Sequence, residues 1–499
     1  MNASSELLGA SLARARDFLA QPLKLLINGQ WLPALSGETF EVINPATGEL
    51  IGRAAAGDAR DVGRAVAAAR QAFESRGWRT MPPADRRALL FKLAEALEAH
   101  ADELSLLETL DNGMPLSVAK FFCRSVAAES LRYCAGWVGK LGGETVEVGV
   151  PDHHVYTLKE PVGVVGAILP WNGPIGMVAS KLGPAIAAGC TVVLKPAELT
   201  PLTAVRVGEL AMEVGFPPGV VNIVTGFGAT AGRALSEHPD VDKISFTGST
   251  AVGKEIIRAA SGNLKRVSLE LGGKSPVIVL ADADLESAAQ SAANAIFWNA
   301  GQICVAGSRL YVHKAVFDRV VGDVVERAGT LKVGSGLDPR TEIGPLISER
   351  HLARVNSYIQ SGLQEGARLI IGGDRLGTDG YFLKPTILTN TNASMRVVRE
   401  EIFGPVLCAM PIDDDDLPAI ARVANDTDYG LSAYVWTRNL SVAHKLAASI
   451  RSGTVRINGG TDLDPAMPFG GMKQSGWGRE NGREGIEQYL ETKSVSIRL

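Results

Sequence analysis

The chain has 499 residues, which is more than one compact core accommodates and predicts two or three lobes. Hydrophobic residues make up 46% and charged residues 21%, the balance of a globular protein, and the formal net charge of -4 gives no reason to expect a nucleic-acid partner. No apolar stretch reaches the roughly 18–20 residues that span a bilayer, so we expect no membrane segment.

The N-terminal part is predicted to be mainly helical. Residues Met1–Lys24 have the spacing of a short amphipathic helix and lack the features of a signal or transit peptide, so we expect a cytoplasmic protein. Lys24–Trp31 predicts a β-hairpin with Asn28-Gly29 as its turn. Long segments rich in alanine and leucine follow at Asp61–Ser75 and Pro83–Thr109, and each has the period of a helix.

Two polar segments that lie far apart in the sequence predict exposed strands. The first is Glu144–Glu160, which is β-branched and carries Pro151, and the second is Thr492–Leu499. Exposed strands are a liability because their unpaired backbone groups invite association. We therefore expect something to pair with them, a neighbouring subunit being one candidate.

Between these segments, short apolar strands alternate strictly with helices. Strands are predicted at Pro161–Leu169, Thr191–Lys195, Val220–Val224 and Lys243–Phe246. Helices are predicted at Ser180–Cys190, Pro201–Gly215 and Ser249–Ala260, and a Gly-rich loop followed by a helix at Gly226–His238. This alternation predicts an α/β fold with a parallel, doubly wound sheet, whose ligands bind at the carboxyl ends of the strands. The residues of interest at those ends are Asn172, Lys195, Gly226, Gly248 and Glu270.

The alternation continues after Gly273 and predicts a second α/β lobe. A strand at Ser275–Leu280 and a helix at Leu285–Ala300 precede the loop that holds Cys304. The acidic run Asp413–Asp416 is expected to cap the helix that follows it, because carboxylates stabilise a helix N-terminus.

Cys304 is a candidate nucleophile, since Gly301 and Gly307, on either side of it in GQICVAGSR, let backbone approach a ligand closely. The five cysteines include no CxxC pair, so neither a disulfide framework nor a metal site is expected. A thiol that attacks a carbonyl carbon gives an oxyanion, which needs a base and a hydrogen-bond donor nearby, and a hydride acceptor where the carbon is oxidised. Glu270, at the end of an apolar strand, is the candidate base, and partial burial would raise its pKa. Asn172 is the candidate donor, because its amide adds no charge.

Three further segments predict contacts with a dinucleotide. Gly226-Phe227-Gly228 precedes a helix but lacks the GxGxxG spacing, because the third glycine is Gly232. Gly248-Ser249 begins a helix whose N-terminus suits a pyrophosphate. Lys195 and Glu198 follow a strand, where they would hold the adenosine ribose. A carboxylate there repels a 2′-phosphate, which favours NAD, with NADP as the alternative.

Each of these residues, taken alone, also fits an ordinary structural role. Cys304 fits a buried core cysteine and Glu270 an exposed strand end. Asn172 fits a turn, and Ser249 fits a simple helix cap. The functional interpretation rests on their joint occurrence in one order along the chain.

In that order the motifs resemble those of the aldehyde dehydrogenase superfamily, essentially from Ile27 to the C-terminus. The motifs are PWN from Pro170, KPAELTP from Lys195, FTGSTAVGK from Phe246, LELGGKSP around Glu270, GQICVAGSR around Cys304, EEIFGPV from Glu400 and PFGGMKQSGWGRE from Pro468. The resemblance implies an NAD(P)-dependent, non-acylating enzyme that oxidises a small-molecule aldehyde.

The resemblance also implies roles for individual residues. Cys304 would be the nucleophile, and Glu270 would activate the hydrolytic water. Asn172 and the Cys304 N–H would form the oxyanion hole, while Lys181 and Glu480 would assist proton handling near Glu270. The residues implied at the cofactor are Trp171, Lys195, Glu198, Gly228, Gly248, Ser249, Glu401 and Phe403.

The fold that the resemblance implies has two doubly wound, Rossmann-like lobes and a small β oligomerisation arm. The NAD-binding domain would comprise residues 1–143 and 160–273, and the catalytic domain residues 274–486. Residues 144–159 and 487–499 would form the arm, which implies a homodimer or a homotetramer.

Departures from the family pattern concern the substrate. Gly173 replaces an aromatic residue that often lines the substrate tunnel, Ala300 stands where many relatives have Gln, and Arg456 where many have Trp. The residues expected in the tunnel are Gly173, Met177, Trp298, Ile303, Val305, Leu463 and Phe469. None of them can clamp a carboxylate, so we expect a bulky apolar aldehyde, arylalkyl or terpenoid. PFGGMKQSG and ETKSV, in the C-terminal half, are also somewhat similar to phenylacetaldehyde-type dehydrogenases.

Four alternatives stay open at this point. One is a dehydrogenase for another aliphatic aldehyde or a semialdehyde. The second forms a CoA thioester and the third reduces acyl phosphates, and the presence of Glu270 disfavours both. The last is a binding protein on the same fold without turnover, which the joint presence of Cys304, Glu270, Asn172 and Lys195 disfavours.

Overall fold

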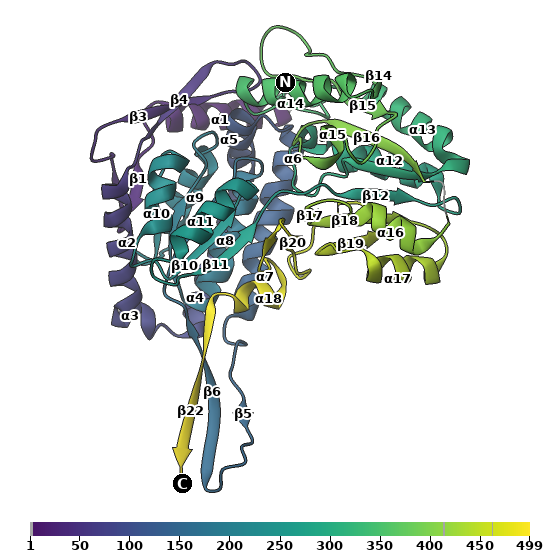
Figure 1. Ribbon diagram of the computed structural model, residues 1–499. Helices are drawn as coiled ribbons and strands as arrows, with labels where there is room; N and C mark the ends of the chain where they lie inside the picture. The colour runs from purple at the N-terminus through teal and green to yellow at the C-terminus, as the bar shows by residue number, and fades with distance from the viewer. Residues whose placement is uncertain (1–2, 413–414, 462) are drawn as a thin grey trace.

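The computed structural model describes residues 3–412, 415–461 and 463–499, and it has two lobes, each built around one sheet (Figure 1). The first sheet has eight strands in the order β2-β1-β9-β8-β7-β10-β11-β21, and its five central strands are parallel. These strands are β1 (Leu25–Ile27), β2 (Gln30–Leu32), β7 (Val164–Ile168), β8 (Thr191–Lys195), β9 (Val221–Ile223), β10 (Lys243–Thr247), β11 (Arg266–Glu270) and β21 (Gly476–Trp477).

Helices bury both faces of the first sheet, because successive side chains of a strand point to opposite faces. Val164 and Ile168 of β7 pack on one face with α2 (Ala59–Glu74), α10 (Arg233–Glu237) and α11 (Thr250–Ala260). Val165 and Ala167 pack on the other face. The helices there are α4 (Pro83–Ala99), α5 (Ala101–Asn112), α7 (Glu129–Trp137), α8 (Pro174–Ala188) and α9 (Leu202–Glu213). The doubly wound α/β prediction is confirmed.

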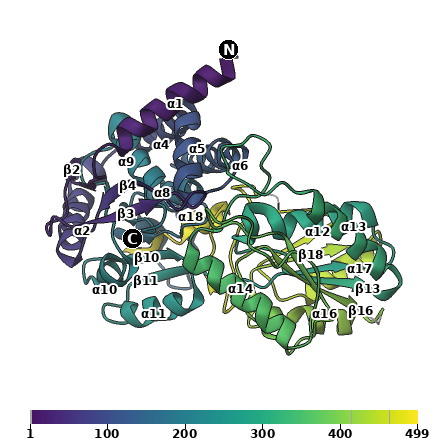
Figure 2. The same ribbon diagram turned by 90° about the horizontal axis from the view of Figure 1, so that it is seen from above.

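The second sheet has seven strands in the order β14-β15-β16-β13-β12-β18-β19, parallel except for β14. They are β12 (Pro276–Val279), β13 (Arg309–His313), β14 (Arg368–Ile371), β15 (Thr386–Thr389), β16 (Val406–Ile412), β18 (Ser432–Trp436) and β19 (Thr454–Ile457). Its helices are α12 (Leu285–Phe297), α13 (Phe317–Thr330), α14 (Glu349–Gln364), α16 (Leu417–Asn425) and α17 (Leu440–Ser449). Figure 2 shows the two lobes side by side.

The arm consists of three antiparallel strands that project from the first lobe (Figure 1). β22 (Leu490–Arg498) pairs with β6 (His153–Pro161) along its whole length, and β5 (Thr145–Val146) pairs with the other edge of β6. The two exposed strands predicted from the sequence therefore pair with each other within one chain.

The N-terminal predictions are confirmed in outline. Helix α1 spans Ala3–Leu19, and both turn residues of the β1–β2 hairpin, Asn28 and Gly29, are left-handed, as a tight hairpin turn requires. The helix expected over Pro83–Thr109 is broken at His100, between α4 and α5. In the described part of the chain, no helix is long and apolar enough to cross a membrane.

Two predictions in the second lobe have different outcomes. The helix expected over Leu285–Ala300 was predicted too long: it ends at Phe297, because Asn299 and Ala300 take left-handed conformations with φ of 50° and 54°. Asp416 caps α16 by accepting a hydrogen bond from the Ala419 N–H (3.2 Å), as expected. Asp413 and Asp414 lie outside the described residues.

The remaining elements are short. The helices are α3 (Arg76–Arg79), α6 (Leu116–Phe121), the π-helix η1 (Phe122–Ala128), the π-helix η2 (Gly228–Gly232), α15 (Arg396–Arg399) and α18 (Gly482–Glu487). The 3₁₀ segments are η3 (Trp298–Gly301) and η4 (Lys314–Val316), and the strands are β3 (Thr39–Ile43), β4 (Leu50–Ala55), β17 (Tyr429–Gly430) and β20 (Met472–Lys473).

Candidate active site

Cys304 lies in the loop between α12 and β13, just after the left-handed turn at Asn299 and Ala300. Backbone from other segments packs directly on this loop. A Cβ on Gly273 would overlap the carbonyl oxygen of Cys304, and a Cβ on Gly301 would overlap that of Gly404. The loop therefore needs glycine at both contacts, and the thiol that it carries is half-buried.

Asn172 comes from the first lobe but is hydrogen-bonded to the Cys304 loop of the second. It follows β7, and its Nδ2 donates to the carbonyl oxygen of Gln302 (2.9 Å). In return, Nδ2 of Asn299 donates to the carbonyl oxygen of Asn172 (3.0 Å). A side-chain amide has two N–H groups, so one of them is left for an oxyanion near the thiol.

One cavity of about 130 Å³ brings together Cys304, Asn172, Glu480 and every residue expected in the substrate tunnel. Those tunnel residues are Gly173, Met177, Trp298, Ile303, Val305, Leu463 and Phe469. No lysine or arginine is among the described lining residues, whose charged members are Asp464 and Glu480.

The sequence analysis missed Phe122, which forms part of this wall. Its ring stacks on that of Trp298, with centroids 5.6 Å apart and an interplanar angle of 15°. A Cβ on Gly173 would lie 3.5 Å from the Phe122 ring. Phe122, the first residue of η1, thus lies beside Gly173, the position at which the family pattern has an aromatic residue. No local motif indicates this contact, because it forms only where η1 and η3 meet in the folded chain.

Glu270 ends β11 and is fully buried, so it is more enclosed than the sequence suggested. It does not line the cavity around Cys304. A Cβ on Gly470 would lie 2.9 Å from Oε1, and Oε2 has no hydrogen-bond partner among the described residues. Burial, and then the charge of Glu480, raise the pKa of Glu270 well above its usual value, while Lys181 opposes the shift.

Lys181 and Glu480 form an ion pair beside Glu270. Lys181 is fully buried on α8, and its ammonium group contacts the carboxylate of Glu480, which itself lines the cavity. The three groups predicted to handle protons therefore interact electrostatically with one another in the folded chain.

The environment of Cys304 disfavours a thiolate. Burial, followed by the charges of Glu401 and Glu270, raises the pKa of the Cys304 thiol to about 12. The thiol therefore needs a base, or a change in the local field, before it can attack.

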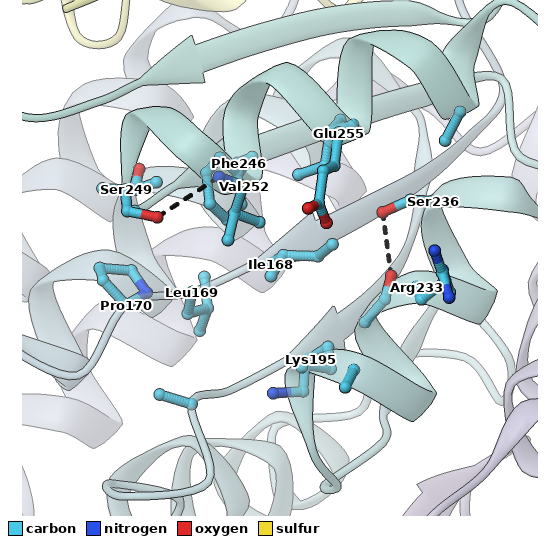
Figure 3. A pocket seen from close by; sticks show the side chains of 18 of the residues that line it. Ile168, Leu169, Pro170, Lys195, Arg233, Ser236, Phe246, Ser249, Val252 and Glu255 are labelled. Carbon is cyan, nitrogen blue, oxygen red and sulfur yellow. Dashed lines mark hydrogen bonds between the residues drawn. The ribbon is translucent and has the colours of Figure 1, made fainter.

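A second cavity, of about 950 Å³, opens at the carboxyl ends of β7, β8 and β10 (Figure 3). The strand order reverses here, since the chain runs from β7 outward to β9 and returns to β10 on the other side, and dinucleotides bind at such points. Six residues predicted at the cofactor line it: Trp171, Lys195, Glu198, Gly228, Gly248 and Ser249.

Polar groups from separate elements surround this cavity. Nζ of Lys195 lies 3.2 Å from Oε2 of Glu198, and Oγ of Ser249 caps α11 by accepting from the Val252 N–H (3.4 Å). Arg233 and Glu255, which the sequence analysis missed, come from the two helices above the sheet (Figure 3). Their positions depend on how α10 and α11 pack, which no local motif encodes.

Glu401 and Phe403 do not line the second cavity. Oε1 of Glu401 accepts from the Gly273 N–H (2.9 Å), beside the Cys304 loop, and burial raises the pKa of Glu401 to about 7. The Phe403 ring meets that of Trp171 edge-on, with centroids 5.3 Å apart. Both residues therefore contact segments that also contribute to the two cavities.

Comparisons with known proteins agree on one family. The profile of the aldehyde dehydrogenase family matches residues 31–495. Putative aldehyde dehydrogenase DhaS of Bacillus subtilis is 48% identical over 486 residues, covering 97% of this chain and 98% of the relative. Phenylacetaldehyde dehydrogenase of Pseudomonas fluorescens is 48% identical over 490 residues, 97% of each chain. The NAD+ complex of aldehyde dehydrogenase from Bacillus cereus superposes with a TM-score of 0.96 at 46% identity, covering 97% of this chain and 98% of that one. This chain belongs to the aldehyde dehydrogenase family.

Proposed function

We propose that this protein oxidises a bulky apolar aldehyde, arylalkyl or terpenoid, to its carboxylic acid with NAD, through a thiohemiacetal and a thioester on Cys304. The observation that carries this proposal is the cavity that holds Cys304 and Asn172 together behind a mainly apolar wall. The family membership supports the reaction, and the wall supports the class of substrate.

The residues around the second cavity fit NAD. The α11 N-terminus suits a pyrophosphate, and the Lys195–Glu198 pair suits a ribose diol. The Thr247 hydroxyl lines the cavity and is buried without a hydrogen-bond partner in the described structure. When bound, NAD would accept the hydride that the substrate loses. The Glu198 carboxylate disfavours a 2′-phosphate, and the Bacillus cereus relative was solved as an NAD+ complex, which also supports NAD over NADP.

The first half of the reaction uses the thiol and the amide. Sγ of Cys304 loses its proton to a base and bonds to the aldehyde carbon, and the carbonyl oxygen becomes an oxyanion. Nδ2 of Asn172 and the Cys304 N–H donate to that oxyanion. Collapse of the oxyanion expels hydride from the carbon and leaves a thioester on Sγ.

The second half uses the buried carboxylate. Glu270 in its ionised form takes a proton from water while the water oxygen bonds to the thioester carbon, and the C–S bond then breaks. The acid leaves, and Cys304 regains a thiol. Lys181 and Glu480, which form an ion pair and interact electrostatically with Glu270, would carry the proton away from it. The balance is one aldehyde, one NAD+ and one water to one acid, one NADH and one proton.

The lining of the cavity favours an apolar tail. The stacked rings of Phe122 and Trp298 offer a flat apolar surface, and no described lining residue is cationic. An anionic semialdehyde would instead meet Asp464 and Glu480. The 48% identity to a phenylacetaldehyde dehydrogenase is compatible with an arylalkyl substrate.

The domain roles and the assembly belong to the same proposal. Residues 1–143 and 160–273 would bind NAD, residues 274–486 would carry the catalytic loop, and residues 144–159 and 487–499 would assemble a cytoplasmic homodimer or homotetramer. The arm exposes apolar side chains that suit such an interface, among them Val146, Val148, Val150, Leu158 and Ile497.

The test follows NADH absorbance with purified protein, NAD or NADP, and a panel of phenylacetaldehyde, a terpenoid aldehyde, succinate semialdehyde and betaine aldehyde. We expect the highest kcat/KM for an apolar aldehyde with NAD, and no turnover in Cys304→Ala. Cys134→Ala, a buried cysteine in α7 outside the cavity, is the matched control and should keep its activity. A preference for succinate semialdehyde, or a strict need for CoA, would contradict the proposal.

A further inference from the structure

The C-terminal turn of α5 contacts the Asn172 segment of the first lobe and the Pro345 segment of the second lobe. Asn112, the last residue of α5, is buried, and its Nδ2 donates to the carbonyl oxygen of Trp171 (2.7 Å), the residue directly before Asn172. Its Oδ1 accepts from the Met114 N–H (3.2 Å), which fixes the orientation of the amide. Asn112 therefore holds the peptide that leads into the oxyanion donor.

Glu108, one turn earlier on α5, holds the other side of Asn172. Its carboxylate is buried, and both oxygens lie 3.3 Å from the backbone N of Ile175, in the first turn of α8. The Asn172 segment is thus fixed before and after the amide by side chains from one helix end.

The same helix end also contacts the second lobe. Gly113 ends α5 with φ of 88°, and a Cβ on it would lie 2.6 Å from the ring of Pro345. The Leu116 N–H donates to the carbonyl oxygen of Gly336 (3.0 Å). No side chain larger than that of glycine fits at residue 113, so α5 and the Pro345 segment are in direct contact.

Gln302 connects the Pro345 segment to the catalytic loop. Its Nε2 donates to the carbonyl oxygen of Pro345 (3.3 Å), and its Oε1 accepts from the Ile347 N–H (2.9 Å). Its own carbonyl oxygen accepts from Nδ2 of Asn172 (2.9 Å), and the chain reaches Cys304 two residues later. The contacts form a closed ring: α5, Asn172, Gln302, Pro345 and back to α5.

We infer that Asn112 and Gln302 are positioning residues that set the distance between the Asn172 amide and Cys304. The inference rests on the proposed function, since both groups must reach one oxyanion. Asn172 and Cys304 come from different lobes, so their relative position is only as fixed as the contacts between the lobes. A misplacement of about 1 Å can cost about a hundredfold in rate, and this ring of contacts prevents such a shift.

The test compares Asn112→Ala in two backgrounds. Alone, it should lower kcat with the best aldehyde by about a hundredfold and leave the dissociation constant of NAD unchanged. In the Asn172→Ala background it should cause no further loss of kcat, because the donor that it positions is absent. Equal losses in the two backgrounds would show a purely structural role and overturn the inference.

Two further variants complete the design. Asn112→Asp keeps the acceptor for Met114 but loses the donor to Trp171, so it should be as slow as Asn112→Ala. Asn222→Ala is the matched control: Asn222 is a buried amide that donates to the Gly219 carbonyl (2.7 Å) and accepts from the Asn28 N–H (3.0 Å), away from both cavities, and it should keep kcat.

If Asn112→Ala does not fold, Gln302→Glu makes the same test, since it keeps the acceptor for Ile347 and loses the donor to Pro345. Wild-type turnover separates the two proposals. An Asn112→Ala enzyme with wild-type kcat overturns only the positioning role, whereas a wild-type protein that oxidises no aldehyde overturns the proposed function and this inference with it.

Discussion

Replacing Glu480 with glutamine should shift the pH dependence of turnover towards lower pH. Glu270 is the proposed base and must be ionised to act, so kcat should rise with pH through its pKa. Burial and the negative charge of Glu480 both raise that pKa, and Lys181 lowers it. Glu480→Gln removes the like charge and leaves the Lys181 cation without its ion-pair partner, and both changes favour the ionised form of Glu270.

The magnitude follows from the charges involved. A nearby opposite charge lowers a carboxyl pKa by about one to three units, and losing a like charge acts in the same direction. The Lys181 side chain is fully buried and that of Glu480 is 11% exposed, so solvent screens this effect little. We therefore expect the midpoint of the kcat profile to fall by at least about one pH unit.

The assay measures kcat from pH 5.5 to 9.5 at saturating aldehyde and NAD. Pre-steady-state bursts of NADH identify the pH range in which thioester hydrolysis limits turnover. Glu484→Gln, which removes an exposed carboxylate from the nearby helix α18, is the control and should leave the profile in place. A midpoint that stays fixed or rises in Glu480→Gln would refute the electrostatic account of Glu270.

Three further predictions concern the substrate, the cofactor and stability. Trp298→Ala removes the ring that stacks on Phe122, so KM for an apolar aldehyde should rise about 10- to 100-fold. The NAD dissociation constant, measured by titration, should stay constant. An unchanged KM for the aldehyde would contradict the assignment of Trp298 to the substrate tunnel. Glu198→Gln should raise kcat/KM with NADP relative to NAD by about tenfold in initial-rate assays, and no change would show that the carboxylate does not face the ribose. Burial raises the pKa of Glu108 from 4.5 to about 8, so the folded state holds a proton that the unfolded state releases. The free energy of unfolding should therefore fall by about 1.4 kcal/mol per pH unit between pH 4.5 and 8. Urea denaturation of Glu108→Gln should show a smaller slope. Identical slopes in the two proteins would refute the raised pKa of Glu108.

Local patterns predicted most of the regular structure. The alternation of apolar strands and helices predicted β7 to β10 nearly residue by residue, because a strand buried on both faces is a short, continuous apolar run. The hairpin was predictable because Asn28-Gly29 is one of the few pairs that tolerates two left-handed residues. Such features depend only on neighbouring residues.

The errors arose where distant segments decide the conformation. Ala300 is left-handed although alanine favours a helix, because the chain must turn there to bring Cys304 beside Asn172. The sequence offered no reason for Phe122 to stack on Trp298, since η1 and η3 meet only in the folded chain. The full burial of Glu270 likewise depends on Gly470, a residue 200 positions later in the sequence.

The residues of the candidate site likewise fall into those that local motifs indicate and those that only contacts in the folded chain reveal. The motifs indicated Cys304, Glu270 and Asn172, and the structure places them on the ends of strands or in the loops beside them. Asn112 carries no comparable signal, because asparagine is a common residue at the C-terminal end of a helix. Only the hydrogen bond from its amide to Trp171 sets it apart.

The central claim is that Cys304 carries the substrate as a thioester that Glu270 helps to hydrolyse. The most direct measurement mixes Glu270→Gln with NAD and phenylacetaldehyde, quenches in acid and determines the mass of the Cys304 peptide. The account predicts one burst of NADH per active site and an acyl adduct on Cys304 that accumulates because hydrolysis is slow. A Glu270→Gln enzyme that turns over at the wild-type rate, or a burst with no adduct on Cys304, would contradict it.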